Sequence, residues 1–316
     1  MGNRLDGQQT TLRNGAVLCG TGVHSGKPVN ATLHPADPDT GVVFHVNRPG
    51  QETVEFRALA SEVGATSFCT ILGDPAGRHV ATVEHFMAAI FGLGVDNVVV
   101  EIDGEEAPIL DGSSRQIVEA LDHAGIQIQA AKRRYIRVLK PVRIDHGGSW
   151  AEFKPHDRTR FEVDIDFDSP AIGRQSIAAD IDSHFFRNEI AGARTFGFLR
   201  DVERLWASGH ALGSSLDNSV VIGHDDHVIN VEGLRWPDEF VRHKMLDAIG
   251  DLALAGARFI GCFRSYRGGH KLNLAALRRL LSDRSAYEIV ETHRTVHGGS
   301  AELVAVATPV YAPWAL

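Results

Sequence analysis

The chain has 316 residues and a formal net charge of -8 at pH 7, with 23% charged residues and three cysteines. Its length allows two ordinary domains, each with its own hydrophobic core. An acidic chain without a basic stripe is not typical of a nucleic-acid-binding protein, and three scattered cysteines do not indicate a disulfide framework.

Signals for a membrane or for assembly are weak in this sequence. No leader-like segment and no apolar run of bilayer length stands out, and no heptad seam indicates a coiled coil. We therefore expect a soluble, monomeric protein of the cytoplasm.

The first half of the chain alternates β-prone runs with helices. Residues 10–36 are short β-prone runs broken by Gly and Pro, which is typical of an antiparallel sheet with tight turns. His24 lies among glycines there, and a turn histidine alone is more often structural than catalytic. Thr82 can cap a helix with His85 in its first turns, and a strand at 96–103 follows.

A second helix follows the loop EEAPILDGSS, with Ser113 or Ser114 as its N-cap. The basic segment 130–134, which has few apolar residues, indicates a boundary. Beyond it the plan is repeated. Strands are expected at 136–145, 149–156 and 159–167, a helix-rich stretch at 183–209 and a hairpin-like segment at 215–230. A helix at 239–256, a strand at 258–266, a loop at 267–272 and a helix at 272–283 follow.

The helix at 239–256 carries the clearest chemical pattern. Its apolar side chains gather on one side, as in a helix packed on a core. His243, Asp247 and Asp251 follow one another at i, i+4 and i+8, so they point the same way. An imidazole and a carboxylate one turn apart can bind one divalent ion. A solvated polar face that only supports the helix explains this stretch alone equally well.

The two halves of the chain share an order of elements. Residues 83–87 (VEHFM) align with 241–245 (VRHKM), and each segment is followed by a strand, a loop and a helix. The loops end in Asp111 and His270, at nearly equal distances after the two aligned histidines. This order indicates an internal duplication.

The duplication predicts the fold and the domains. We expect an α+β protein of two similar domains, each a β-sheet layered with helices, packed face to face in a two-domain sandwich. The first domain, residues 1–130, would supply Glu84 and His85. The second domain, residues 131–316, would supply His243, Asp247 and His270.

Facing domains would bring the starts of the equivalent helices together, so that His85 joins His243 and Asp247. Two imidazoles and one carboxylate, with one position left to water, form the ligand set of a catalytic zinc, and iron(II) suits this set about as well. Glu84 is then the natural general base, because adjacent helical residues point about 100° apart. On its own, His85 is more often a buried core histidine than a ligand.

Six segments carry a resemblance to a known family: GTGVHSGK at 20–27, TVEH at 82–85, APILDGSS at 107–114, ARTFGF at 193–198, EFVRHKMLDAIGDL at 239–252 and GGHKLN at 268–273. These segments resemble the zinc-dependent UDP-3-O-acyl-N-acetylglucosamine deacetylases, LpxC, of lipid A synthesis in Gram-negative bacteria. The resemblance runs over nearly the whole chain, and the HKMLDAIGDL block is specific.

The resemblance implies catalytic roles for residues already grouped. The family's zinc ligands fall on His85, His243 and Asp247. Its general base falls on Glu84. His270 matches a second catalytic group, held as imidazolium and able to protonate the leaving amine, and Asp251 matches the carboxylate that orients it.

The resemblance also implies contacts with the substrate. Thr195 matches a hydroxyl that helps the metal to hold the oxyanion, and Lys244 matches a cation that faces the pyrophosphate. Asp166 and Phe167 lie where the family contacts uridine, with the ring as a stacking face. Arg267 stands where relatives have lysine, and its planar fork can grip phosphate better.

The implied reaction is hydrolysis of the acetamide on the glucosamine ring. The long 3-O-acyl chain of this substrate needs an apolar groove, and the stretch near 196–230 has no counterpart in the first half, so we expect it to form this passage. Phe196, Phe198 and Leu199 are the candidate linings. A helix that packs its own Leu and Trp inward is an equally good interpretation.

Two other functions stay open from the sequence alone. A metal hydrolase of another amide or ester would use the same zinc chemistry but would need no nucleotide contacts. A non-catalytic protein that binds a nucleotide-linked sugar, with a metal bracing two domains, would not require Glu84 and His270.

Overall fold

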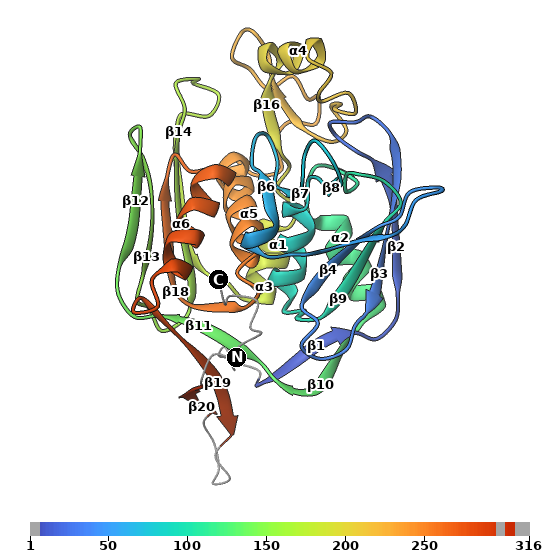
Figure 1. The fold of residues 1–316 in the computed structure, drawn as a ribbon. Coiled ribbons are helices and arrows are strands. Elements are labelled where there is room, and N and C mark those ends of the chain that lie inside the picture. The colour runs from blue at the N-terminus through green and yellow to red at the C-terminus, as the bar shows by residue number, and fades with distance from the viewer. Residues whose placement is uncertain (1–6, 295–300, 307–316) are drawn as a thin grey trace.

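Two mixed β-sheets enclose a central layer of helices (Figure 1). The computed structural model describes residues 7–294 and 301–306. The main helices of the central layer are α1 (Glu84–Leu93), α2 (Arg115–Ala124), α5 (Glu239–Ala253) and α6 (His270–Ser282). One sheet comes from the first half of the chain and the other from the second half, which confirms the mixed α+β fold predicted from the sequence.

The first sheet has five strands in the order β2-β3-β9-β4-β5. Their bounds are Ala16–Thr21 (β2), Pro28–Pro35 (β3), Val42–Val46 (β4), Val54–Arg57 (β5) and Val98–Ile102 (β9). Alternate residues of β9 are buried, because successive side chains point to opposite faces of a sheet. Three short strands and a 3₁₀ turn lie between β5 and α1: Ala60–Glu62 (η1), Val63–Ala65 (β6), Ile71–Gly73 (β7) and His79–Val80 (β8).

The second sheet has eight strands. Their bounds are Arg134–Val138 (β11), Val142–His146 (β12), Ser149–Lys154 (β13), Thr159–Asp166 (β14), Arg174–Asp180 (β15), Arg258–Tyr266 (β18), Tyr287–Arg294 (β19) and Ala301–Ala305 (β20). The central strand β18 pairs antiparallel with β13 and parallel with both β14 and β11. After β15 the chain forms the short helix α3 (Ser183–Phe185) and a π-helical turn, η2 (Phe186–Ile190).

A two-stranded ribbon joins the two halves. β1 (Gln8–Leu12) pairs antiparallel with β10 (Ile126–Lys132), and β11 begins at Arg134. The basic segment 130–134 is therefore where the chain leaves the ribbon and enters the second sheet.

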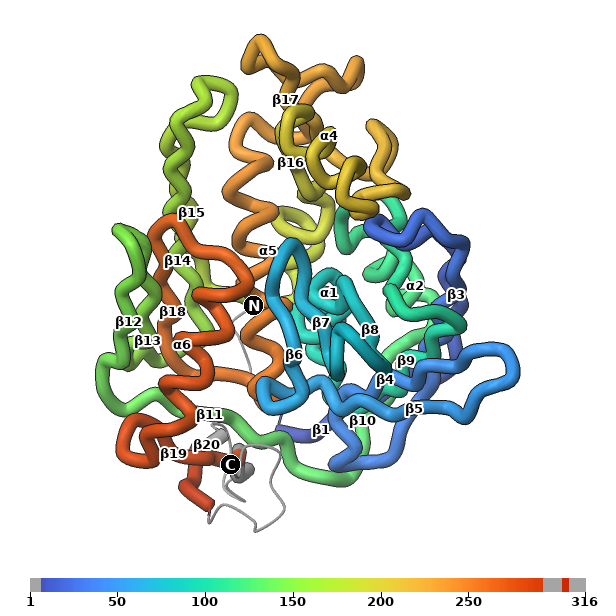
Figure 2. The backbone as a smooth tube through the Cα atoms, turned by 45° about the horizontal axis from the view of Figure 1, so that its top comes forward, coloured from blue at the N-terminus to red at the C-terminus, as the bar shows by residue number. Residues whose placement is uncertain are grey.

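A small unit projects from the second half. β16 (Phe196–Phe198) and β17 (Val220–Ile222) pair in parallel, and α4 (Leu199–Ala207) lies between them in the chain. Figure 2 shows these elements together, away from the two large sheets. The hairpin-like segment predicted at 215–230 is confirmed in part. An antiparallel bridge joins Ile222 to Val228 across a turn, but the strand β17 pairs with β16 and not with a second strand of this segment.

The helices α1 and α5 cross in close contact at the centre of the molecule. A Cβ atom added at Gly250 would lie 2.1 Å from the backbone oxygen of Glu84, so only glycine allows this approach. Every residue of α1 is buried, which explains why its apolar residues lie on all sides. Thr82 is not the N-cap of α1, because Val83 occupies that position and Thr82 has a φ of 60°. No helix within the described residues is long and apolar enough to cross a membrane.

Candidate active site and metal centre

Three side chains that could hold a metal ion meet where α1 contacts α5. His85 is the second residue of α1, and His243 and Asp247 lie one turn apart on α5. Asp247 Oδ1 lies 3.3 Å from His243 Nε2 and 3.8 Å from His85 Nε2, and one ligand atom of each residue lies within 4.8 Å of the others. Donors bonded tetrahedrally at about 2.0–2.1 Å lie about 3.3 Å apart, so this spacing fits one divalent ion.

These donors also have the protonation states that a metal requires. His243 Nδ1 lies 3.0 Å from the carbonyl oxygen of Ala193, which only accepts, so Nδ1 carries the proton and Nε2 presents its lone pair. Burial, reinforced by His243, lowers the pKa of His85 to about 3. Burial acts to raise the pKa of Asp247, but His243 and Lys244 outweigh burial and lower it. The result is two neutral imidazoles and a carboxylate, which fit a divalent cation such as Zn²⁺.

A further buried carboxylate adjoins His85, His243 and Asp247. Glu84 is the first residue of α1, and only 4% of it is exposed. Its Oε2 accepts a hydrogen bond from the backbone N–H of Thr70 at 3.0 Å. Burial raises the pKa of Glu84 to about 7, although the nearby His270 acts to lower it. A carboxylate with a pKa near neutrality suits a general base.

A protonated histidine faces this carboxylate. His270 begins α6, and its Nε2 lies 3.9 Å from Glu84 Oε1. On its other side, His270 Nδ1 donates to Asp251 Oδ2 at 2.9 Å. Burial acts to lower the pKa of His270, but Asp251 outweighs burial and raises it to about 10. Near neutral pH the site therefore combines a group that accepts a proton with a group that donates one.

Asp251 is held by partners from both halves of the chain. It accepts hydrogen bonds from Thr70 Oγ1 at 2.7 Å and from Asn273 Nδ2 at 2.8 Å, in addition to His270. Neither Thr70 nor Asn273 was predicted from the sequence. Asn273 stands three residues after His270 on α6, so the helical period indicates it in retrospect. Thr70 lies 181 residues from Asp251 in the chain, and no local pattern marks it.

A cavity of about 670 Å³ opens onto these residues. Its polar part is lined by Glu84, His85, His243, Asp247 and His270. Its apolar part includes Val23, Phe68, Ile109, Phe196, Phe198, Val202, Leu205 and Val221. Both halves of the chain and the projecting unit contribute to it, so the cavity can hold a hydrocarbon chain next to the polar group.

Comparison with known proteins identifies the family. A family model described as UDP-3-O-acyl N-acetylglycosamine deacetylase, LpxC, matches residues 9–282. Proteins named UDP-3-O-acyl-N-acetylglucosamine deacetylase from Brucella ovis, Brucella abortus and Brucella melitensis are each 56% identical to this chain over 287 residues. These matches cover 91% of this chain and 100% of each relative. The chain belongs to this deacetylase family. The resemblance drawn from the motifs is thereby confirmed.

Three residues that the deacetylase motifs assign to the substrate line the cavity: Phe167, Thr195 and Lys244. The backbone of Thr195 is fixed, because its N–H donates to the Gly112 oxygen at 2.7 Å. Lys244 Nζ donates to Asp247 Oδ2 at 2.9 Å and lies 5.5 Å from the centre of the Phe196 ring. The structure thus places a cation and aromatic faces beside the three residues that could hold a metal ion.

Two other residues assigned from the deacetylase motifs lie together, but they are not among the residues that line the cavity. Asp166 ends β14, where it accepts a hydrogen bond from Tyr266 Oη at 2.6 Å and lies 3.2 Å from Arg267 Nη2. Arg267 is 43% exposed in its side chain and has a φ of 51°, which is uncommon for a residue other than glycine. Leu199, the first residue of α4, is not among the lining residues either.

Proposed function

We propose that this chain hydrolyses UDP-3-O-acyl-N-acetylglucosamine to UDP-3-O-acyl-glucosamine and acetate, the committed step of lipid A biosynthesis. The observation that carries this proposal is the buried group of His85, His243 and Asp247, next to Glu84 and His270 in a largely apolar cavity. Relatives at 56% identity, which the chain covers fully, bear the name of this activity.

The proposed metal is Zn²⁺, and Fe²⁺ fits the same donors about as well. When bound, it would activate water as the nucleophile and polarise the acetamide carbonyl. Glu84 would accept a proton from the attacking water, and His270 would donate its Nε2 proton to the nitrogen as the C–N bond breaks. The hydroxyl of Thr195 would donate to the developing oxyanion. Asp251 would keep His270 charged and oriented.

The proposed substrate contacts extend from this centre. Lys244 would face the pyrophosphate, and Phe167 would stack on uridine, since both line the cavity. Asp166 and Arg267, which form an exposed ion pair, would contact uridine and a phosphate oxygen respectively. The acyl chain would lie against the rings of Phe196 and Phe198.

We also propose that the two halves, residues 1–130 and 131–316, are domains that arose by duplication. In the first sheet, β9 pairs antiparallel with β3 and parallel with β4. In the second sheet, β18 pairs in the same way with β13 and β14. Each central strand follows one helix and precedes another, α1 and α2 in the first half and α5 and α6 in the second. The monomeric state and the cytoplasmic location stay predictions from the sequence.

The direct test of the proposed function is acetate release from UDP-3-O-acyl-N-acetylglucosamine by the purified chain, with bound metal quantified in the same sample. We expect stoichiometric release of acetate and free amine. A protein that holds one metal ion but releases no acetate from this substrate would contradict the substrate assignment, and other amides would then be assayed.

A bell-shaped dependence of kcat/KM on pH is expected. The rate should rise as Glu84 loses its proton, at or below its pKa of about 7 because a bound cation lowers that pKa further. It should fall as His270 loses its proton, at or below its pKa of about 10, because the same bound cation also lowers the pKa of His270. Initial rates across this range measure both limbs. His270→Gln should remove the alkaline limb, whereas His34→Gln should not, because His34 lies on β3 and is not among the residues that line the cavity.

The length of the acyl chain is expected to affect kcat/KM through α4. Leu205 lines the cavity from a helix that buries no residue fully, so Leu205→Trp should fill the passage without disturbing the core. Each methylene that is no longer buried should cost about 0.8 kcal/mol, or about fourfold in kcat/KM. Assays with substrates of increasing chain length measure this loss. Glu203→Trp on the same helix is the control. An equal loss of kcat/KM in both variants would contradict the proposal that Leu205 lines the passage for the acyl chain.

A further inference from the structure

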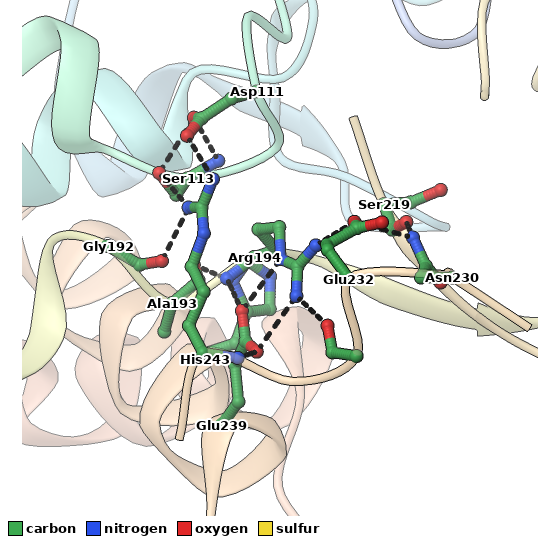
Figure 3. Close-up of polar contacts among 12 residues, drawn as sticks. Asp111, Ser113, Gly192, Ala193, Arg194, Ser219, Asn230, Glu232, Glu239 and His243 are labelled. Carbon is green, nitrogen blue, oxygen red and sulfur yellow. Dashed lines mark hydrogen bonds and ion pairs between the residues drawn. The ribbon is translucent and has the colours of Figure 1, made fainter. Parts of the chain in front are cut away.

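The segment from Gly192 to Arg194 lies beside His243, which is a proposed metal ligand (Figure 3). The carbonyl oxygen of Ala193 accepts from His243 Nδ1 at 3.0 Å and so fixes the ring. The Gly192 oxygen accepts from Arg235 Nη1 at 2.8 Å. Whatever holds this segment therefore holds both the ligand and the hydroxyl-bearing residue that follows.

A buried ion pair holds the segment. Arg194 Nε and Nη2 donate to the two carboxylate oxygens of Glu239 at 2.9 and 3.2 Å, and the Arg194 backbone N–H donates to Oε1 at 3.0 Å. Arg194 is 2% exposed and Glu239 is 0% exposed. Glu239 is the first residue of α5 and lies one turn before His243. The contacts thus form a closed ring, from α5 through Glu239 and Arg194 to the Ala193 carbonyl and back to α5 through His243.

This ring is also tied to the first half of the chain. The backbone N–H of Arg235 donates to Glu239 Oε2 at 2.6 Å, and Arg235 Nη2 donates to Asp111 Oδ2 at 2.9 Å. Figure 3 shows Asp111, Gly192, Arg194 and Glu239 in one continuous set of polar contacts.

We propose that Arg194 and Glu239 form a positioning pair that orients His243 Nε2 toward the metal and fixes the backbone at Thr195. Two buried charges are a costly way to gain stability alone, because well-packed apolar residues often stabilise a core as well or better. A planar fork that meets a carboxylate at two points fixes direction as well as distance. The proposal has two parts. The role at Thr195 rests on the proposed deacetylase function, whereas the orientation of His243 is measured as metal affinity and needs no substrate.

The test is Arg194→Lys, which keeps the charge but loses the two-point contact. Removing outer partners of a metal ligand typically costs about 10–100-fold in affinity, so we expect Zn²⁺ to bind about 10–100-fold more weakly in competition with a chelator. The control is Arg133→Lys. Arg133 is also buried and makes a two-point contact with Asp96, where Nε donates to Oδ1 at 2.9 Å and Nη2 donates to Oδ2 at 2.7 Å. This pair lies near Gly94, at the opposite end of α1 from His85. It should lose similar stability but keep its Zn²⁺ affinity.

A second matched pair covers the case in which Arg194→Lys does not fold. Glu239→Gln should weaken Zn²⁺ binding, whereas Asp96→Asn should not. The Tm of each variant is measured as well, so that the loss of Zn²⁺ affinity can be compared with the loss of stability. For active variants, kcat should fall more than KM changes, because Thr195 would act on the oxyanion, which develops only in the transition state. Zn²⁺ affinity that falls equally in the Arg194 and Arg133 variants, or only in proportion to Tm, would overturn the proposal. Because chelator competition needs no substrate, this result is independent of the deacetylase assignment.

Discussion

Glu84→Gln is expected to lower kcat by about 10²–10⁴-fold, the usual contribution of a positioned general base, while the protein still binds one metal ion. Glutamine has nearly the shape of glutamate and can still accept the hydrogen bond from the Thr70 N–H, but it cannot take a proton from water. The ligands His85, His243 and Asp247 are unchanged, so metal content should stay at the level of the unaltered chain. Acetate release and metal content, measured on the same preparation, check both statements.

A matched control for this substitution is Glu101→Gln. Glu101 lies on β9 with a 43% exposed side chain paired to His34, so its loss should leave both rate and metal unchanged. If Glu84→Gln retained most of the rate, the general base would be another group. If it lost the metal, Glu84 would have to be counted among the ligands.

The second large effect is expected for His85→Ala, which should lose both the metal and the activity. Two donors would be left on α5, and the buried carboxylate of Asp247 would lose a neighbour 3.8 Å away. Adding Zn²⁺ at about 100 times its Kd should stabilise the unaltered chain by about 2.7 kcal/mol, seen as a rise in Tm. His85→Ala should show no such rise at the same concentration.

His34→Ala serves as the control, because its side chain is 43% exposed on β3 and lies outside the cluster. A Zn²⁺-dependent rise in Tm that persists in His85→Ala would show that the ion binds elsewhere. The Tm of the metal-free forms of His85→Ala and His34→Ala reports folding stability alone, so the test of the metal site is the rise in Tm on adding Zn²⁺.

Much of the site could be predicted because residues four apart in the sequence are neighbours on a helix, whatever the rest of the chain does. His243, Asp247 and Asp251 lie on one face of α5 for this reason. His85 could be added because the order of elements in the two halves is alike. The structure brings His85, His243 and Asp247 close together, as the spacing and the order of elements predict, and their role as metal ligands stays a prediction.

Other features depend on contacts that no short pattern records. Arg194 meets Glu239 across 45 residues, and Thr70 meets Asp251 across 181. Thr82 was expected to cap α1, but its hydroxyl donates to the buried Glu106 at 3.1 Å and its backbone is left-handed. The segment at 215–230 has the turn composition of a hairpin, yet its strand pairs with β16 across α4. The secondary-structure propensity of a segment depends only on its own residues. The hydrogen bond of Thr82 and the pairing of β17 depend instead on residues elsewhere in the chain.

The placement of the active site between the two halves also sets when it can form during synthesis. At about 5–20 residues per second, the 162 residues from His85 to Asp247 take about 8–32 s to be made. Through that interval the first half carries Glu84 and His85 without the helix that covers them, and a lone imidazole is a weak metal site. The nascent chain therefore cannot load its metal early, and neither half released on its own would hold the ion or hydrolyse an amide. The full set of three proposed donors is therefore present only after both halves have been made and have packed together.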